Sequence, residues 1–245
     1  MPPILNVAAY RFVELDDLPS LRSLLLQRAE AAALKGTVLL APEGINLFLA
    51  GAPAAVRGWL QQLQADPRFA CLEVKDSYSA EVPFRRLRVR IKREIIRMNQ
   101  PAIRPVAGRA PSVDAPTLAR WLSQGHCDEG RPVVMLDTRN GFEVDHGAFD
   151  NAIDWRLNRF TEFPGALAEH MPELQGKTIV SYCTGGIRCE KAAIWMHEQG
   201  LAHTLQLDGG ILKYFEQVPG APHYHGGCFV FDEREALDPE LKALA

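Results

Sequence analysis

The 245-residue sequence predicts an α/β protein with two domains, an α+β domain followed by an α/β domain built on a parallel sheet. Three observations lead to this prediction. Strand-like and helix-like patterns alternate along both halves, a proline-rich stretch separates them, and a hydrophobic share of 47% is enough to build two ordinary cores.

The first half alternates β-rich and helical patterns in the order βαββαβ. The expected elements are strands at 7–15, 36–40, 45–50 and 72–96, and helices at 18–34 and 53–64. The turn Ala41-Pro42-Glu43-Gly44 joins the second and third strands, because Pro followed closely by Gly interrupts a continuous strand. This order is typical of a ferredoxin-like (acylphosphatase-like) sandwich, which we assign to residues 1–100.

The second half follows a linker at residues 101–112, where three prolines and Gly108 break the periodicity. Its expected elements are helices at 115–122, 163–170 and 190–199, and strands at 133–136, 178–182 and 204–207. Ser112 or Asp114 can cap the first of these helices. This alternation predicts a parallel α/β domain at 113–217, followed by an irregular C-terminal tail at 218–245.

The overall composition narrows the class of protein. A net charge of −3 gives no whole-chain reason to expect binding to nucleic acid or membranes. The N-terminus lacks a basic region followed by an apolar one, and no later stretch has the length of a membrane span. Five scattered cysteines indicate a reducing compartment and not a disulfide framework. We therefore expect a cytoplasmic protein with no membrane partner.

Cys183 is the strongest candidate for a reactive residue, because it directly follows the predicted strand that ends at Tyr182. The active-site loop expected after it contains Thr184, Gly185, Gly186, Ile187 and Arg188. Small residues allow backbone N–H groups to converge on the sulfur, and a following helix adds positive potential. This environment favours a thiolate or persulfide anion. Arg188 either completes the anion site or braces the loop.

The Cys-x4-Arg spacing favours some chemistries over others. Cysteine phosphatases surround a tetrahedral phosphate with a loop one residue longer, whereas this shorter ring suits a single sulfur or oxygen atom. The structural alternative is a buried cysteine beside a glycine-rich turn. Cys189, just beyond the loop, is expected to serve a packing role, with a resolving thiol for an oxidised Cys183 as the alternative.

Several separated motifs resemble the rhodanese family. They are Leu136-Asp137-Thr138-Arg139 with Glu143, His146-Gly147-Ala148, Ala152-Ile153, the cysteine loop, and Leu207-Asp208-Gly209-Gly210. The resemblance implies a rhodanese-like domain in which Asp137 and Arg139 support the site by organising its surroundings. A structural ion pair at a strand end is the favoured interpretation of these two residues, and His146 is expected to hold the fold.

Three further segments narrow the resemblance to the bacterial tRNA uridine-34 hydroxylase family. They are Ala41-Pro42-Glu43-Gly44-Ile45-Asn46, the signature from Cys183 to Ala192, and the stretch from Gly227 to Arg234. The resemblance implies oxygen-dependent hydroxylation of the wobble uridine at carbon 5, with Cys183 as the catalytic residue. It also implies tRNA, through its anticodon arm, as the partner and molecular oxygen as co-substrate.

No cofactor is evident, because the sequence offers no flavin fingerprint, haem motif or iron facial triad. Two other functions remain open. A Cys183 persulfide would make the protein a sulfurtransferase, and an inactive loop would leave a rhodanese module that only binds RNA or protein. We predict no metal site, since His223, His225 and Cys228 form only a partial and unevenly spaced zinc set.

A basic stripe is expected to bind tRNA. The segment from Glu81 to Arg109 contains nine basic and two acidic residues, which gives it a local charge of +7. Alternation places Leu87, Val89 and Ile91 on one side and the basic side chains on the other. The predicted tRNA-binding residues are Arg86, Arg88, Arg90, Lys92 and Arg93. The alternative is a solvated edge strand whose charges prevent pairing with other chains.

Overall fold

The computed structural model describes residues 3–244 and divides the chain into two compact units. The first contains Met1–Arg97 and the short segment Phe231–Arg234, and the second contains Met98–Val230 and Glu235–Ala245. Within the described part, no helix is both long enough and apolar enough to cross a lipid bilayer.

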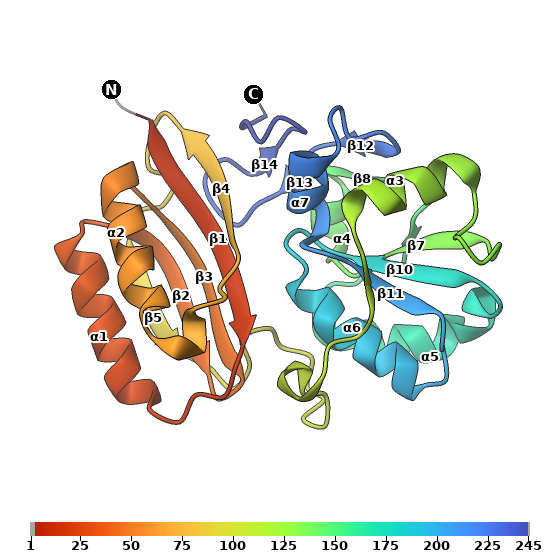
Figure 1. Ribbon diagram of the computed structural model, residues 1–245, viewed down its shortest axis with the longest axis horizontal. Coiled ribbons are helices and arrows are strands. Elements are labelled where there is room, and N and C mark those ends of the chain that lie inside the picture. The colour runs from red at the N-terminus through yellow and green to blue at the C-terminus, as the bar shows by residue number, and fades with distance from the viewer. Residues whose placement is uncertain (1–2, 245) are drawn as a thin grey trace. The chain divides into compact units, whose positions relative to one another are not determined.

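The first unit is a five-stranded sheet covered on one face by two helices (Figure 1). Its strands are β1 (Ile4–Phe12), β2 (Lys35–Ala41), β3 (Gly44–Gly51), β4 (Val74–Ser79) and β5 (Leu87–Ile91), and its helices are α1 (Leu18–Ala31) and α2 (Pro53–Gln64). The antiparallel order β4-β1-β3-β2 confirms the ferredoxin-like class, and β5 adds a parallel strand beside β2. The β-rich region expected at 72–96 is therefore two strands at opposite edges of the sheet.

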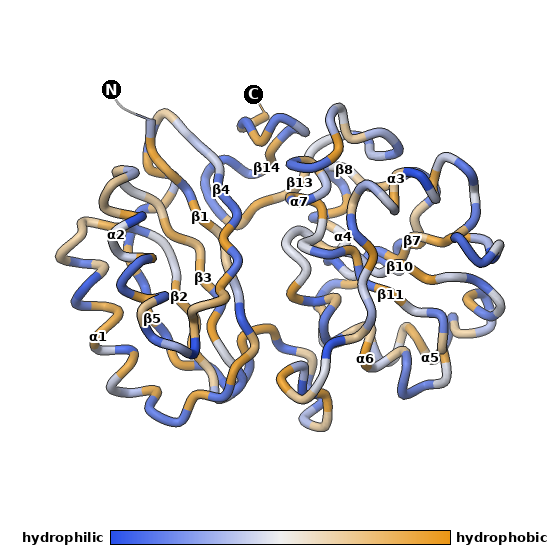
Figure 2. Tube along the Cα trace, viewed as in Figure 1, coloured by the Kyte–Doolittle hydropathy of each residue, from blue (hydrophilic) through white to orange (hydrophobic). Residues whose placement is uncertain are grey.

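Burial of an apolar stripe explains why α1 forms. Blue and orange alternate along this helix in Figure 2, and its buried residues Leu21, Leu25 and Ala29 recur every four residues on one face. The helix ends earlier than the expected 18–34, since Ala33 has a left-handed φ of 53°. The turn between β2 and β3 needs glycine at Gly44, where φ is 148° and a Cβ would lie 2.0 Å from the Arg11 carbonyl oxygen.

The second unit has a wholly parallel sheet in the order β6-β11-β10-β7-β9. Its strands are β6 (Ser112–Val113), β7 (Val133–Asp137), β9 (Ile153–Asp154), β10 (Thr178–Tyr182) and β11 (Thr204–Leu207). This confirms the predicted α/β class. Ser112, expected in the linker, already belongs to β6, and the preceding stretch contains a 3-10 turn at Pro105–Ala107.

Helices cover both faces of this sheet (Figure 1). They are α3 (Ala115–Gln124), α5 (Phe163–Leu174), α6 (Ile187–Glu198) and α7 (Gly210–Gln217), with the short α4 (Gly141–Val144) following β7. Helices α3 and α7 pack together on one face, and α5 and α6 pack together on the other. Asp114 caps α3, because its Oδ1 accepts a hydrogen bond from the Thr117 N–H at 2.8 Å. The sequence did not predict α7, whose first residue is Gly210.

The segment expected as an irregular tail at 218–245 is distributed between the two units. In the second unit, β12 (Tyr224–Gly226) pairs with β8 (Gly147–Phe149), and β13 (Cys228–Phe229) pairs with β14 (Ala236–Leu237). Residues 231–234 belong to the first unit, where Arg234 Nη1 donates to Ser77 Oγ at 2.7 Å. Strands of two or three residues show no readable alternation, which explains why the sequence pattern did not reveal them.

Candidate active site

Cys183 lies at the carboxyl end of β10, the central strand of the parallel sheet. Backbone hydrogen bonds tie its loop to the neighbouring loops. The Thr138 N–H, after β7, donates to the Tyr182 carbonyl at 3.0 Å, and the Ile211 N–H, after β11, donates to the Cys183 carbonyl at 3.0 Å. Three strand ends therefore hold the cysteine loop, as expected for a site in a parallel sheet.

Gly210 explains the glycine pair of the Leu207-Asp208-Gly209-Gly210 motif. Its φ is 68°, and a Cβ at this position would lie 2.4 Å from the Cys183 carbonyl oxygen. Any side chain would push α7 away from the cysteine loop. The motif therefore packs the start of α7 against the backbone of the cysteine loop.

The Cys183 sulfur is fully buried and accepts a hydrogen bond from the Gly186 N–H at 3.1 Å. Burial alone would raise its pKa. The hydrogen bond from the Cys189 thiol, the charge of Arg188 and the loop N–H groups outweigh burial, and they lower the pKa of Cys183 from 9.0 to about 5. These contacts favour the thiolate form of Cys183 at neutral pH.

Cys189 is the neutral partner of this thiolate. Burial and the adjacent Cys183 anion raise the pKa of Cys189 well above the ordinary thiol value, so its S–H remains available to donate. Thr138 Oγ1 lies 3.7 Å from the Cys189 sulfur. The hydrogen bond between the Cys189 and Cys183 sulfurs fits both roles that the sequence allows for Cys189, a packing residue and a resolving thiol.

Arg188 braces the loop through a buried, bidentate ion pair with Glu143. The Arg188 Nη1 to Glu143 Oε2 distance is 2.6 Å, and the Nη2 to Oε1 distance is 2.7 Å. The positive charge of Arg188 also lowers the pKa of Cys183. Arg188 therefore both braces the loop and contributes to the anion site, the two roles that the sequence left as alternatives. The role of Glu143 was not predicted, although a buried arginine in the loop signals the need for a nearby carboxylate.

Asp137 and Arg139 form a second buried ion pair at the end of β7. Arg139 Nη2 lies 2.6 Å from Asp137 Oδ2 and donates to the Gly147 carbonyl at 2.7 Å. Both side chains are completely buried. The contacts of this pair join the end of β7 to α4 and β8, which is the geometry of an ion pair that organises the surroundings of the site.

The other predicted loop residues have distinct positions. Thr184 Oγ1 donates to the Phe229 carbonyl at 3.3 Å, and Gly186 is the N-cap of α6 with a φ of 97°. Ile187 is the first residue of α6, so this helix begins three residues before the expected Glu190. Gly185 lies between them, where a Cβ would meet no atom within 4 Å. The early helix start places Arg188 and Cys189 in the first turn.

Comparisons with known proteins identify both units. Residues 4–95 match the model of the UPF0176 acylphosphatase like domain, and residues 118–217 match the rhodanese-like domain. The tRNA uridine(34) hydroxylase of Bordetella avium is 68% identical over 98% of this chain and 99% of its own length. The proteins of the same name from Variovorax paradoxus and Bordetella pertussis are 66% and 61% identical over the whole chain, covering 93% and 100% of their lengths.

The chain belongs to the tRNA uridine(34) hydroxylase family. This confirms the resemblance seen in the sequence. Among solved structures, the rhodanese-like domain of Anabaena sp Alr3790 is 20% identical with a TM-score of 0.38, covering 47% of this chain and 79% of that one.

In this member of the family, the predicted basic stripe (Arg86, Arg88, Arg90, Lys92 and Arg93) runs along β5 at the sheet edge. Val89 is buried in the core, whereas Arg88 is half-buried and Arg90 exposed on the opposite side. Arg86, Lys92 and Arg93 flank the strand and are exposed. Ile91 departs from the expected alternation, since it is 41% exposed at the strand end. The same edge position also fits the alternative interpretation, in which these charges only keep an exposed edge strand from pairing with other chains.

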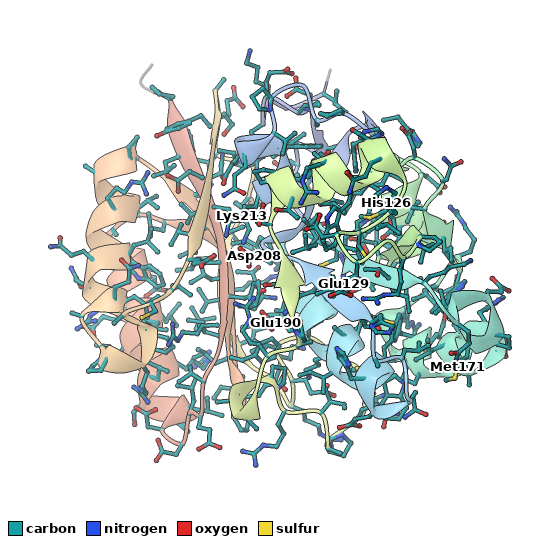
Figure 3. The ribbon with its side chains drawn as sticks, turned by 45° about the vertical axis from the view of Figure 1, so that its right-hand side comes forward. His126, Glu129, Met171, Glu190, Asp208 and Lys213 are labelled. Atoms are coloured by element: carbon teal, nitrogen blue, oxygen red, sulfur yellow. The ribbon has the colours of Figure 1, made fainter. Side chains whose placement is uncertain are left out.

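Two arginines counted in the +7 region have acidic partners. Arg85 Nε donates to Glu233 Oε1 at 2.6 Å, and Arg109 Nη2 lies 2.7 Å from Glu190 Oε1. Near Glu190, Asp208 and Lys213 lie side by side in Figure 3 and are joined at 2.5 Å. Ion pairing therefore reduces the positive field of the region outside the basic stripe.

The partial zinc set of the sequence does not converge. His223 Nε2 contacts Ser123 Oγ at 2.9 Å, His225 Nδ1 contacts Asp150 Oδ1 at 3.3 Å, and Cys228 is buried. Over residues 3–244, no group of three His, Cys, Asp or Glu side chains is arranged to hold a metal ion.

The lowered pKa of Cys183 predicts a distinctive alkylation profile. The iodoacetamide rate at Cys183, read by peptide mass spectrometry, should be half-maximal near pH 5, because the thiolate is lost below that value. Cys189→Ala should move the midpoint upward by removing a hydrogen-bond donor, whereas Cys189→Ser keeps a donor and should shift it less. A wild-type midpoint near pH 9 would contradict this account of the site.

Proposed function

We propose that this protein hydroxylates carbon 5 of uridine 34 in tRNA, with molecular oxygen as co-substrate and Cys183 as the reacting residue. One oxygen atom enters the base, and a two-electron reductant such as a thiol converts the other to water. The observation that carries the proposal is a stabilised Cys183 thiolate in a chain that matches two tRNA uridine(34) hydroxylases over 93% and 99% of their lengths. The loop N–H groups and Arg188 keep this sulfur unprotonated and ready to react at neutral pH. Cytoplasmic location, where tRNA is found, is part of the proposal.

The basic stripe supplies the proposed contact with the anticodon arm. Side chains along an exposed strand edge can follow a phosphate backbone, which provides affinity without reading sequence. Uridine 34 must leave the anticodon stack before its carbon 5 can approach a buried sulfur. Binding by the stripe and extrusion of the base are therefore separate steps in this proposal.

Nucleoside mass spectrometry of tRNA from cells lacking the gene tests the function directly. Loss of 5-hydroxyuridine and its derivatives, restored by the wild-type gene, is the expected result. Loss of a thiolated base would instead indicate sulfur transfer, and no change in either would leave a binding module. With purified protein, tRNA and a thiol reductant, ¹⁸O₂ should add the heavy isotope to the product, whereas labelled water should not.

Sulfur transfer is the second candidate, because the short Cys-x4-Arg loop and a buried thiolate also suit a Cys183 persulfide. The Cys183 thiolate would take the outer sulfur of thiosulfate as a persulfide and release sulfite, and cyanide would then remove that sulfur as thiocyanate. Sulfur transfer would be favoured if the protein formed thiocyanate as fast as it thiolated tRNA and formed no 5-hydroxyuridine.

Charge reversal of the basic stripe should weaken tRNA binding. The triple variant Arg88→Glu, Arg90→Glu and Lys92→Glu should lower affinity strongly and reduce the slope of log K against log salt by about 2 to 3, since each lost phosphate contact removes about 0.7 to 0.9. Fluorescence anisotropy with labelled tRNA at several salt concentrations measures both quantities.

A matched variant separates a local contact from an effect of net charge. Arg120→Glu, Arg156→Glu and Arg159→Glu change the net charge equally, and all three side chains are exposed in the second unit. This control should change the salt slope by less than 1. Equal losses of tRNA affinity in the two triple variants would refute the proposal that the basic stripe binds tRNA.

A further inference from the structure

Phe142 is an exposed aromatic side chain next to the active-site machinery. It is 49% exposed, whereas the adjacent Glu143 is completely buried and holds Arg188 of the cysteine loop. A half-exposed ring adds little to the stability of a four-residue helix, and beside a reactive site it is accessible to a bound ligand. Phe142 therefore requires an explanation beyond the stability of α4.

Phe142 belongs to an aromatic cluster with His146 and Phe229. The ring centroids of Phe142 and Phe229 lie 5.3 Å apart with an interplanar angle of 89°, and those of His146 and Phe229 lie 5.1 Å apart. The Phe229 carbonyl also accepts the hydrogen bond from Thr184, the residue that follows Cys183. One cluster thus connects an exposed ring to the loop of the reactive sulfur.

The backbone around Phe142 is fixed on both sides. The Asn140 N–H donates to Glu143 Oε2 at 3.0 Å, and the same carboxylate receives the Arg188 guanidinium at 2.6 Å. The Gly141 N–H donates to the Leu157 carbonyl at 2.8 Å. The Phe142 ring is consequently presented from a rigid turn that is tied directly to the cysteine loop.

We propose that Phe142 is the aromatic surface on which the target pyrimidine stacks after it leaves the anticodon loop. This inference rests on the proposed function. A base removed from its stack loses aromatic contacts, and proteins that bind unstacked bases replace them with Phe, Tyr, Trp or His rings. An uncharged ring supplies this contact without discriminating among bases, so Phe142 positions the base beside Cys183 and takes no part in bond formation.

Anticodon stem-loops with either uridine or an abasic residue at position 34 test this proposal with the full-length protein. Phe142→Ala should weaken binding of the uridine loop by about 5- to 150-fold, the usual range for loss of one stacked base. Binding of the abasic loop should change less than twofold, because no base remains to stack. Phe142→Tyr should retain most of the affinity for the uridine loop.

The control substitution is Val106→Ala, which removes part of another exposed apolar side chain from the second unit. It should leave binding of both loops unchanged. Phe142→Ala should also preserve the melting temperature and the alkylation profile of Cys183, since a half-exposed ring contributes little to the core. These readouts separate loss of stacking from damage to the site.

Equal weakening of the two loops by Phe142→Ala, or no weakening of either, would overturn the stacking proposal while leaving the proposed function intact. Failure of the wild-type protein to bind either loop, together with unchanged 5-hydroxyuridine in cells lacking the gene, would overturn the proposed function itself.

Discussion

Replacing Cys183 by serine is expected to abolish 5-hydroxyuridine formation. A serine hydroxyl stays protonated where the cysteine is a thiolate, so the loop N–H groups and Arg188 would face a neutral group. Loss of the reacting group should reduce the turnover rate on the order of 10³-fold or more. Nucleoside mass spectrometry of tRNA incubated with the purified variant measures this loss, and tRNA affinity should remain within twofold.

Cys71 provides the matched control, because it is an exposed cysteine in the first unit. Cys71→Ser makes the same chemical change away from the proposed site and should retain full activity. Normal turnover by Cys183→Ser would eliminate Cys183 as the reacting residue. Loss of activity in both variants would show that cysteine-to-serine substitution inactivates the protein in general, so that the result at Cys183 would not indicate a reacting thiolate.

Removing Glu143 is expected to destabilise the second unit more than almost any other single substitution. Glu143→Ala leaves the Arg188 guanidinium buried without its bidentate partner, and breaking such a pair costs about 3–5 kcal/mol. The cysteine loop would lose its brace at the same time. Urea unfolding followed by tryptophan fluorescence measures the change, since Trp121, Trp155 and Trp195 all lie in this unit.

Asp128→Ala is the control for this prediction. Asp128 also pairs with an arginine through both oxygens, at 2.5 and 2.9 Å from Arg120, but both side chains are more than half exposed. Solvent screening should limit its cost to at most about 1 kcal/mol. Similar losses of unfolding free energy in Glu143→Ala and Asp128→Ala would show that the buried Glu143–Arg188 pair contributes no more to stability than an exposed pair.

The position of Cys183 was predictable because two local signals coincide. A short apolar run ending at Tyr182 indicates a buried strand, and the glycines that follow indicate a tight turn into a helix. The pairing of Glu143 with Arg188 was not predictable in the same way. It depends on the first turns of α4 and α6 meeting at the carboxyl ends of the neighbouring strands β7 and β10, and no pattern within either segment specifies that distance.

The first unit shows a similar limit. The alternation of Arg88, Val89 and Arg90 correctly indicates a strand with one apolar side. Its placement beside β2, at the opposite edge from β4, results from parallel pairing over a long sequence separation. Local patterns determine which residues form a strand, whereas the packing of distant segments determines its neighbours.

The return of Phe231–Arg234 to the first unit means that the chain cannot be divided into two independent fragments by a single cut. Cleavage after Arg97 would separate Ser77 from the Arg234 side chain that donates to it, and Phe48 from the Phe231 ring 6.4 Å away. The N-terminal fragment would lack part of its own native structure, and the C-terminal fragment would carry a segment without its partner. The N-terminal unit of this protein is thus completed by residues encoded near the other end of the gene.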